Sequence, residues 1–200
     1  MSIIYNRGTM NQQELSNQDS IKIIMEMVQS TKYNIARDKV IYLMWGYLVA
    51  ISSLAHYVLK FQFEISQAYY VWLSMPVAGI ITGIYYGRKK KHSTAKTFTD
   101  RAMSSIWIAF IVALIIFLLA SPQIGWSAVY PIFMVLYGIG TATSGGIMKF
   151  KPLVIGGYLS MGVGLLAFYQ PFDIQLFLLA LAVIVSYVIP GHLLPKAQND

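Results

Sequence analysis

The side chains of this sequence that invite a chemical interpretation are three histidines and one serine. His56, His92 and His192 are the only histidines among 200 residues, and long stretches of chain separate them. A metal site needs three or four converging ligands, but the sequence has no HExxH pattern and no cysteine. We therefore expect each histidine to form local hydrogen bonds, and we predict neither a metal nor a cofactor.

The serine is Ser144, and together with His192 it invites comparison with the rhomboid proteases. Those enzymes carry the serine of a GxSG motif on their fourth span and a histidine on their sixth. Here Ala142 stands where the first glycine of the motif belongs, and Ser144 falls toward the opposite end of its span. We expect the Ser144 hydroxyl to bond a carbonyl of its own helix instead.

Two prolines are weaker candidates for a binding site within the apolar stretches. Pro76 and Pro190 each remove a backbone donor, so a carbonyl near them is open to a ligand or to a neighbouring helix. Helix-end prolines are often only caps or kinks, so we weigh both alternatives. Pro190 also lies two residues before His192, so we treat the two residues as one candidate polar site.

Intramembrane charge is missing, and this counts against several classes of membrane protein. Ion-coupled carriers and voltage sensors place Asp, Glu, Lys or Arg inside the helix bundle, whereas the long apolar stretches here contain none. The sequence also has no phosphate-binding loop and no dinucleotide fingerprint. We therefore expect no enzyme activity and no intrinsic ion coupling.

The elements that must position these residues are six apolar stretches. The composition is 56% hydrophobic and only 12% charged, with a mean hydropathy of +0.57, whereas a soluble domain is about 25% charged. Each stretch has roughly the length needed to cross a bilayer. The sequence therefore predicts an all-α polytopic membrane bundle with spans at 40–59, 69–87, 104–121, 128–148, 152–170 and 174–194.

Lysine and arginine positions predict the orientation of this bundle. Of the 15 basic residues, every one except Lys60 falls on the cytoplasmic side if both termini are cytoplasmic. The strongest determinant is the run Arg88, Lys89, Lys90 and Lys91. We interpret this run as a topology anchor, with an anionic-lipid headgroup site as the alternative. Because the placement of basic residues on the cytoplasmic side accounts for the net charge of +7, we expect no nucleic-acid partner.

The sequence predicts three regions along the chain. Residues 1–15 are polar, and we expect a flexible terminus there. Residues 16–39 carry apolar side chains at helical spacing, which predicts an amphipathic helix that lies on the membrane or binds a cytoplasmic protein. Residues 40–195 form the transmembrane domain, for which we predict the cytoplasmic membrane of a bacterium.

Small residues recur four positions apart in three of the predicted spans. Lipid tails are as apolar as leucine, so close packing at small residues drives helix association in a membrane. We expect spans two, four and five to make the closest contacts, either within one chain or between the chains of a homo-oligomer. The residues concerned are Gly79, Gly83, Gly87, Gly138, Ala142, Gly146, Gly156, Ser160 and Gly164.

Several short motifs resemble those of small integral membrane proteins from Bacteroidetes-type bacteria. The resemblance covers roughly residues 20–195 and implies a bacterial inner-membrane location, but it implies no activity and no site residues. The motifs are Trp45-Gly46-Tyr47-Leu48, Tyr70-Val71-Trp72-Leu73-Ser74-Met75-Pro76, Tyr137-Gly138-Ile139-Gly140-Thr141, the run from Ser144 to Pro152 and the run from Val188 to Leu194.

Two functions follow from these observations. The first is a non-catalytic membrane module that acts by contact with a protein partner or with lipid. The alternative is a small carrier or channel for an apolar or lipid-like solute, which requires a cavity lined by Tyr, Ser and Thr. A solidly packed bundle would count against this alternative.

Overall fold

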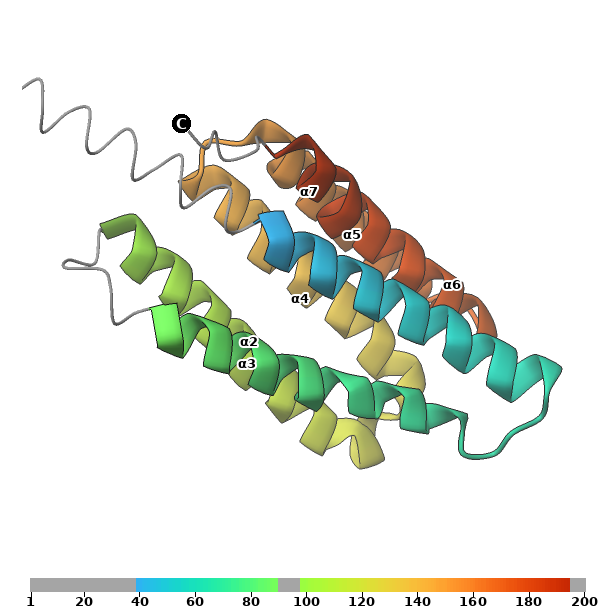
Figure 1. Ribbon diagram of the computed structural model, residues 1–200. Helices are drawn as coiled ribbons and strands as arrows, with labels where there is room; N and C mark the ends of the chain where they lie inside the picture. Colours follow the sequence, from blue (N-terminus) through green and yellow to red (C-terminus); the bar gives the residue numbers. More distant parts are fainter. Residues whose placement is uncertain (1–38, 90–97, 195–200) are drawn as a thin grey trace, which may run out of the picture. The chain divides into compact units, whose positions relative to one another are not determined.

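The computed structural model describes residues 39–89 and 98–194, and these are helical apart from short turns (Figure 1). The described residues belong to one compact unit, Lys39–Leu194. The first described helix is Lys39–Gln62, whose last turn is the π-helical η1 (Val58–Gln62). The elements that follow are η2 (Ala68–Leu73), α2 (Ser74–Lys89), α3 (Phe98–Ile124), α4 (Trp126–Ile147), α5 (Lys151–Ala167), α6 (Phe172–Val183), η4 (Ile184–Val188) and α7 (Ile189–Leu193).

Five of these helical segments are long and apolar enough to cross a membrane. They are Lys39–Gln62, Ala68–Tyr85, Thr99–Ile124, Trp126–Ile147 and Phe172–Leu193. The remaining apolar helix, α5, has 17 residues, which is at the lower limit of about 17 for a span. The prediction of an all-helical chain with several helices long and apolar enough to cross a membrane is confirmed for the described residues.

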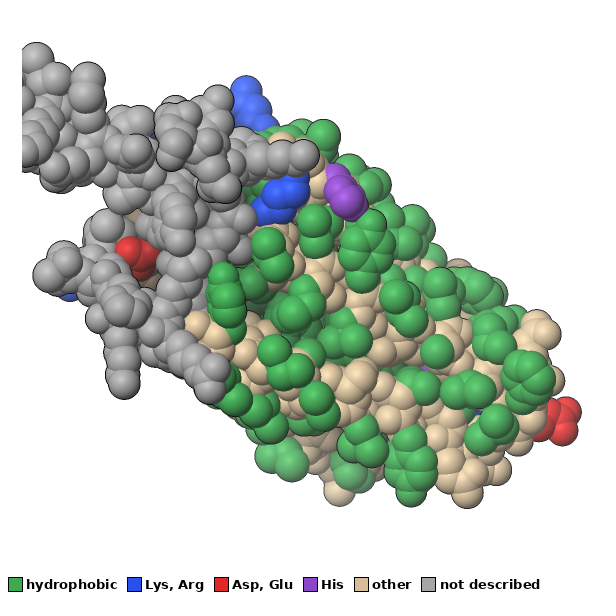
Figure 2. All heavy atoms as spheres, in the orientation of Figure 1, with side chains coloured by type: hydrophobic (Ala, Val, Ile, Leu, Met, Phe, Trp, Pro, Cys, Tyr) green, Lys and Arg blue, Asp and Glu red, His purple; other side chains and the backbone are tan. Residues whose placement is uncertain are grey.

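Side-chain exposure agrees with a hydrocarbon surrounding. Leu119 in α3 is 77% exposed and Ile80 in α2 is 63% exposed, which would be costly in water. Figure 2 shows apolar side chains spread over the outside of the described helices, with charged side chains near the two ends. Lipid tails solvate such a surface at no cost, so the outward-facing apolar residues need no protein partner.

The packed centre of the molecule is built by α4, α5 and α6. Helix α4 packs closely on α3, α5 and α6, and α5 also packs on η4 and α7. In the most apolar stretch of α4, 56% of residues are buried, against none in that of α3. Helix α2 packs closely only on η2 among the labelled elements. Burial is therefore highest in α4, whereas in the apolar stretch Ala68–Tyr85, which contains most of α2, only 11% of residues are buried.

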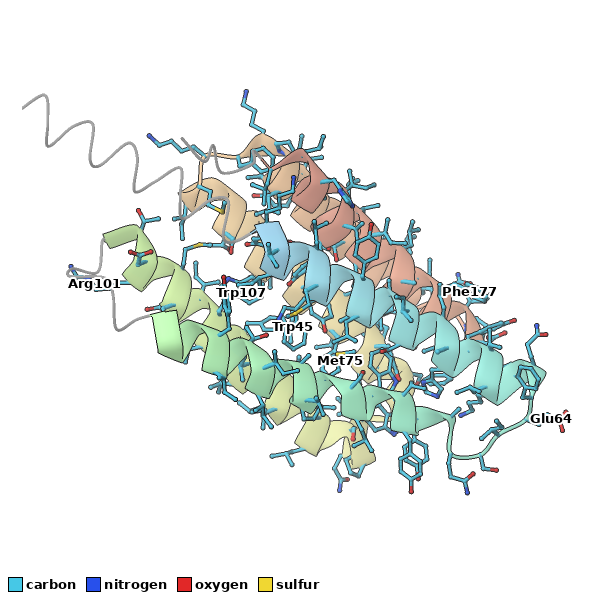
Figure 3. All side chains as sticks on the ribbon, viewed as in Figure 1. Trp45, Glu64, Met75, Arg101, Trp107 and Phe177 are labelled. Atoms are coloured by element: carbon cyan, nitrogen blue, oxygen red, sulfur yellow. The ribbon has the colours of Figure 1, made fainter. Side chains whose placement is uncertain are left out.

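The first described helix runs antiparallel to the last segment of the chain. The Lys39 ammonium donates to the carbonyl oxygen of Leu194 at 2.9 Å, and the Ser53 hydroxyl donates to that of Leu176 at 2.7 Å. Near the other end, the rings of Tyr57 and Phe177 lie 4.2 Å apart (Figure 3). The start of this helix and the end of α7 therefore lie at the same end of the bundle.

Short turns with the expected residues separate the later helices. Gly125, with φ of +78°, lies between α3 and α4, a conformation that favours glycine. Pro152 stands in the first turn of α5, where its missing N–H costs nothing. Pro171 precedes α6 in an extended conformation. Because these connections are only a few residues long, successive helices fold back as antiparallel neighbours.

Candidate functional site

Small residues make the closest approach in the structure, between α4 and α5. A β-carbon added to Gly138 would lie 2.5 Å from the carbonyl oxygen of Gly157. One added to Gly157 would lie 2.5 Å from the backbone nitrogen of Ala142. The Ser160 hydroxyl donates to the Met134 carbonyl at 2.9 Å and adds a polar tie. The two backbones therefore touch along the predicted face of α4, whereas the closest contact on α5 is made by Gly157, which the four-residue spacing did not predict.

Two further glycines of α5 pack on other elements. Gly156 faces Val185 and Pro190, so that α5 also approaches η4 and α7. Gly164 faces the Pro131 carbonyl and Met134 at the start of α4, each 3.1 Å from an added β-carbon. The expectation that spans four and five pack through small residues therefore agrees with these contacts.

On α2, the predicted glycines make no such contact within the described chain, and a contact between chains stays a prediction. A β-carbon added to Gly79 or to Gly83 would meet no atom within 4 Å, and Gly146 at the end of α4 is equally open. The side chains around Gly87 lie outside those described. Spacing alone permits a close approach but does not enforce one, and α2 approaches its neighbours through larger side chains near its start.

One of these larger side chains belongs to a cluster around His56 at one end of the bundle. The Trp72 indole N–H donates to His56 Nδ1 at 3.0 Å, and the Tyr130 hydroxyl lies 3.3 Å from the same nitrogen. The Phe172 ring packs edge-on against His56 at 5.9 Å, and Lys60 Nζ lies 4.9 Å from the centre of the Phe172 ring. Four separate segments therefore converge on His56.

His192 lies at the other end, beside the start of the first described helix. Its Nε2 is 2.8 Å from the Tyr47 hydroxyl, and its carbonyl accepts from Lys39 Nζ at 3.1 Å. A lysine beside the last carbonyls of a helix is favourable. Pro190, two residues earlier, is buried against Gly156. Its position next to the π-helical turn η4 makes it part of the packed core.

Ser144 departs from the expected hydrogen bond. Thr141 and Thr143 donate to carbonyls one turn back, at 2.8 and 2.7 Å. The Ser144 hydroxyl is fully buried and has no partner among the described residues. It therefore forms no hydrogen bond with His192, and the two do not form a catalytic pair. Among the described residues, no group of three His, Cys, Asp or Glu is placed to hold a metal ion.

Two interior features were not predicted from the sequence. Gln175 Nε2 donates to three carbonyls, those of Ser127, Ala167 and Gln170, at 2.9 to 3.1 Å. A Gln within the first turn of an apolar helix is the only local signal for this tie. The second feature is a set of mutually contacting rings between α3, α4, η4 and the first described helix, with centroids 5.3 to 6.3 Å apart: Tyr42, Trp107, Phe110, Tyr137 and Tyr187.

Two predicted sites lie outside the described residues. These are the amphipathic segment 16–39, of which only Lys39 is described, and the side chains of Arg88, Lys89, Lys90 and Lys91. No protein-family model, curated protein or solved structure matches the chain. Its function is therefore argued from the geometry of the described residues.

Proposed function

We propose that this chain is a non-catalytic, multi-pass membrane protein that acts by contact, through the open small-residue face of α2. The supporting observation is that Gly79 and Gly83 meet no atom within 4 Å of an added β-carbon. The same spacing in α4 and α5 brings backbones into contact. A glycine face that is unpacked within the chain offers a second transmembrane helix the close approach that drives association in lipid.

The proposed topology is six crossings of a bacterial inner membrane with both termini cytoplasmic. Lys39 bonds the carbonyls of His192 and Leu194, which supports an even number of crossings between them. The basic residues concentrate at that end of the spans and in the 88–101 segment, as the positive-inside rule requires. The resemblance to small membrane proteins of Bacteroidetes-type bacteria supports the same location.

Two further contacts complete the proposal on the cytoplasmic side. Arg88–Lys91 would anchor the topology and attract anionic lipid headgroups, at about 1 kcal/mol per basic residue near the surface. Residues 16–39 would bind a cytoplasmic protein through their apolar stripe. The partner on α2 would be either a second copy of this chain or a helix of another membrane protein.

A photo-cross-linking residue at position 80 tests this proposal in native membranes. Ile80 lies beside the two glycines, whereas Ile81 lies on the opposite side of α2, at 100° of rotation per residue. The two are similarly exposed, at 63% and 57%. We expect a protein adduct from position 80 and only lipid adducts from position 81. If position 80 also captures only lipid, the interaction proposal is wrong.

A matched pair of glycine variants sharpens the same experiment. Gly83→Leu fills the open face of α2 and should abolish the adduct from position 80. Gly162→Leu makes the same change on α5, at a glycine that also meets no atom within 4 Å, and should leave the adduct intact. An adduct that persists in Gly83→Leu would show that the partner does not use the glycine face.

The carrier alternative receives less support from the described residues. Helices α4 and α5 are in backbone contact at Gly138 and Gly157, and the Tyr-rich interior is filled by rings that touch one another. If the chain does move lipid, reconstituted vesicles should lose the protection of inner-leaflet fluorescent lipid from an external reductant. We expect no such loss above that of protein-free vesicles.

A further inference from the structure

We propose that His56 and Trp72 form a proton-sensitive latch that ties the start of α2 to the first described helix. His56 is 4% exposed and belongs to the first described helix, whereas Trp72 belongs to η2, immediately before α2. The hydrogen bond from Trp72 Nε1 to His56 Nδ1 measures 3.0 Å. It joins two segments that the chain connects only through the turn at residues 63–67.

The latch follows from the hydrogen-bonding capacity of the two side chains. An indole N–H can donate but never accept. His56 Nδ1 must therefore carry a lone pair when Trp72 bonds to it, and the neutral ring then carries its proton on Nε2. A second proton on the ring would occupy the lone pair of Nδ1 and place two N–H groups face to face. The hydrogen bond from Trp72 exists only while His56 is neutral.

Tyr130 gives the protonated ring an alternative partner. Its hydroxyl oxygen lies 3.3 Å from the same Nδ1, and a hydroxyl can both donate and accept. When His56 is neutral, Trp72 donates to Nδ1, and the Tyr130 hydroxyl lies beside the same nitrogen. When a proton from water binds Nδ1, the new N–H donates to the Tyr130 oxygen, and the bond from Trp72 to His56 is lost. The proton therefore moves His56 from a contact with η2 to a contact with α4.

A second hydrogen bond ties the start of α2 to the first described helix. The Ser74 hydroxyl donates to the Val71 carbonyl at 2.8 Å, so in the 3.3 Å pair between Ser52 and Ser74 the donor is Ser52. Further along α2, the faces of Gly79 and Gly83 meet nothing. Loss of the bond from Trp72 to His56 therefore leaves the Ser52–Ser74 pair to hold the start of α2 at this point.

The connection between the two helices is suited to a hinge. Residues 63–67 are all exposed, and Glu64 takes a left-handed φ of +54° (labelled in Figure 3), an uncommon conformation for a residue other than glycine.

The charged and titratable groups that face His56 are few. Lys60, one turn along the same helix, acts on it electrostatically, and Tyr130 faces it from α4. Phe172 faces it from α6 and Trp72 from η2, and neither side chain titrates. Lys60 is exposed near the end of the bundle, where water can supply the proton. The described surroundings offer His56 no carboxylate contact that would hold the proton permanently.

A distance measurement between two spin labels tests the latch on the purified full chain. The sequence has no cysteine, so Ile51→Cys and Ile84→Cys, both at exposed positions, report on the first described helix and α2 alone. The pH is lowered from about 8 to about 4, a range that extends well below the ordinary pKa of histidine, about 6.5. We expect the population with a longer distance to rise about tenfold, as the loss of one hydrogen bond implies.

Two variants separate the latch from a general effect of acid. His56→Gln keeps an acceptor for Trp72 but cannot titrate near neutral pH, so the short distance should persist at both pH values. Trp72→Phe removes the donor, so the longer distance should be populated at both. A second label pair at Ile139 and Ile155, on α4 and α5, should not change in any variant and shows that the bundle stays folded.

Three results would each overturn the latch. One is a distance that does not change with pH in the otherwise unmodified chain. Another is a pH response that survives in His56→Gln. The third is a Trp72→Phe chain that still closes at high pH. Because no partner is present in this measurement, its outcome is independent of the cross-linking test of α2.

Discussion

The small-residue faces of α2 and of α4 and α5 share one spacing but differ in their surroundings. Across α4 and α5, Gly138 and Gly157 bring the two backbones into contact. On α2, Gly79 and Gly83 face no atom of the described chain. Glycines four residues apart therefore make close packing possible, while other features of the chain decide whether a second helix packs against them.

Chain connection is one such feature. Only Met148, Lys149 and Phe150 separate α4 from α5, so the two helices must lie side by side, and their small faces meet with little loss of entropy. Helices α2 and α3 are joined by a longer segment, residues 90–97. At its start, α2 is tied by Trp72 and Ser74 instead.

The largest expected effect comes from filling the closed face. Gly157→Leu places a side chain against the Ala142 nitrogen and the Gly138 carbonyl, at 2.5 and 2.6 Å, and backbone atoms cannot move aside. The free energy of unfolding should fall by about 3 kcal/mol, measured by equilibrium unfolding in mixed micelles. Gly162→Leu, on the same helix, should change it by less than about 0.5 kcal/mol. Equal effects at the two positions would show that α5 does not pack more closely at Gly157 than at Gly162.

The next effect concerns the polar tie beside the closed face. Gln175→Leu removes the shared donor of three carbonyls, a buried one on Ala167 and two partly buried ones on Ser127 and Gln170. The free energy of unfolding should fall by about 2 kcal/mol in the same assay. Gln170→Leu changes an exposed side chain of the same type and should have little effect. A stable Gln175→Leu protein would mean that the carbonyls find other donors.

A smaller effect separates bonds between helices from bonds within one helix. Ser160→Ala removes the hydroxyl that joins α5 to the Met134 carbonyl of α4. The expected loss is about 0.6 kcal/mol, the average for such bonds in a membrane. Thr143→Val removes a bond to Ile139 within α4 and should cost less. The reverse order would show that packing, rather than the hydroxyl, governs this site.

The smallest expected effect comes from the open face. Gly83→Ala should leave the free energy of unfolding unchanged or raise it slightly, by less than about 0.5 kcal/mol, because alanine is the better helix former and nothing stands in its way. Gly138→Ala should lower it clearly, since a β-carbon there meets Gly157. A Gly83→Ala protein as unstable as Gly138→Ala would place the α2 face in contact within the chain.

Positions of the helices were largely predictable. The expected spans at 128–148 and 174–194 correspond to Trp126–Ile147 and Phe172–Leu193, because runs of apolar residues bounded by Pro, Gly and Lys mark where a helix enters and leaves hydrocarbon. The third helix is longer than expected, Thr99–Ile124 against 104–121. The first turns of this helix are polar, so a prediction from hydropathy alone begins the helix too late.

Side-chain sites were less predictable for a definite reason. Thr141 and Thr143 bond their own helix as expected, because those partners lie one turn away in sequence. His56 finds Trp72 and Tyr130, and these lie 16 and 74 positions along the chain. Hydropathy contains no information about which of many aromatic residues will face a given histidine.

By itself, the sequence determined that most of this chain is helical and surrounded by hydrocarbon, because an unpaired backbone is too costly in lipid for any other arrangement of such apolar runs. Tertiary structure alone decided which glycine faces close and which stay open. It also decided that His56 joins four segments while Ser144 is buried without a partner among the described residues. These arrangements depend on contacts between residues far apart in the chain, and the spacing of residues along the sequence does not predict their distance in space.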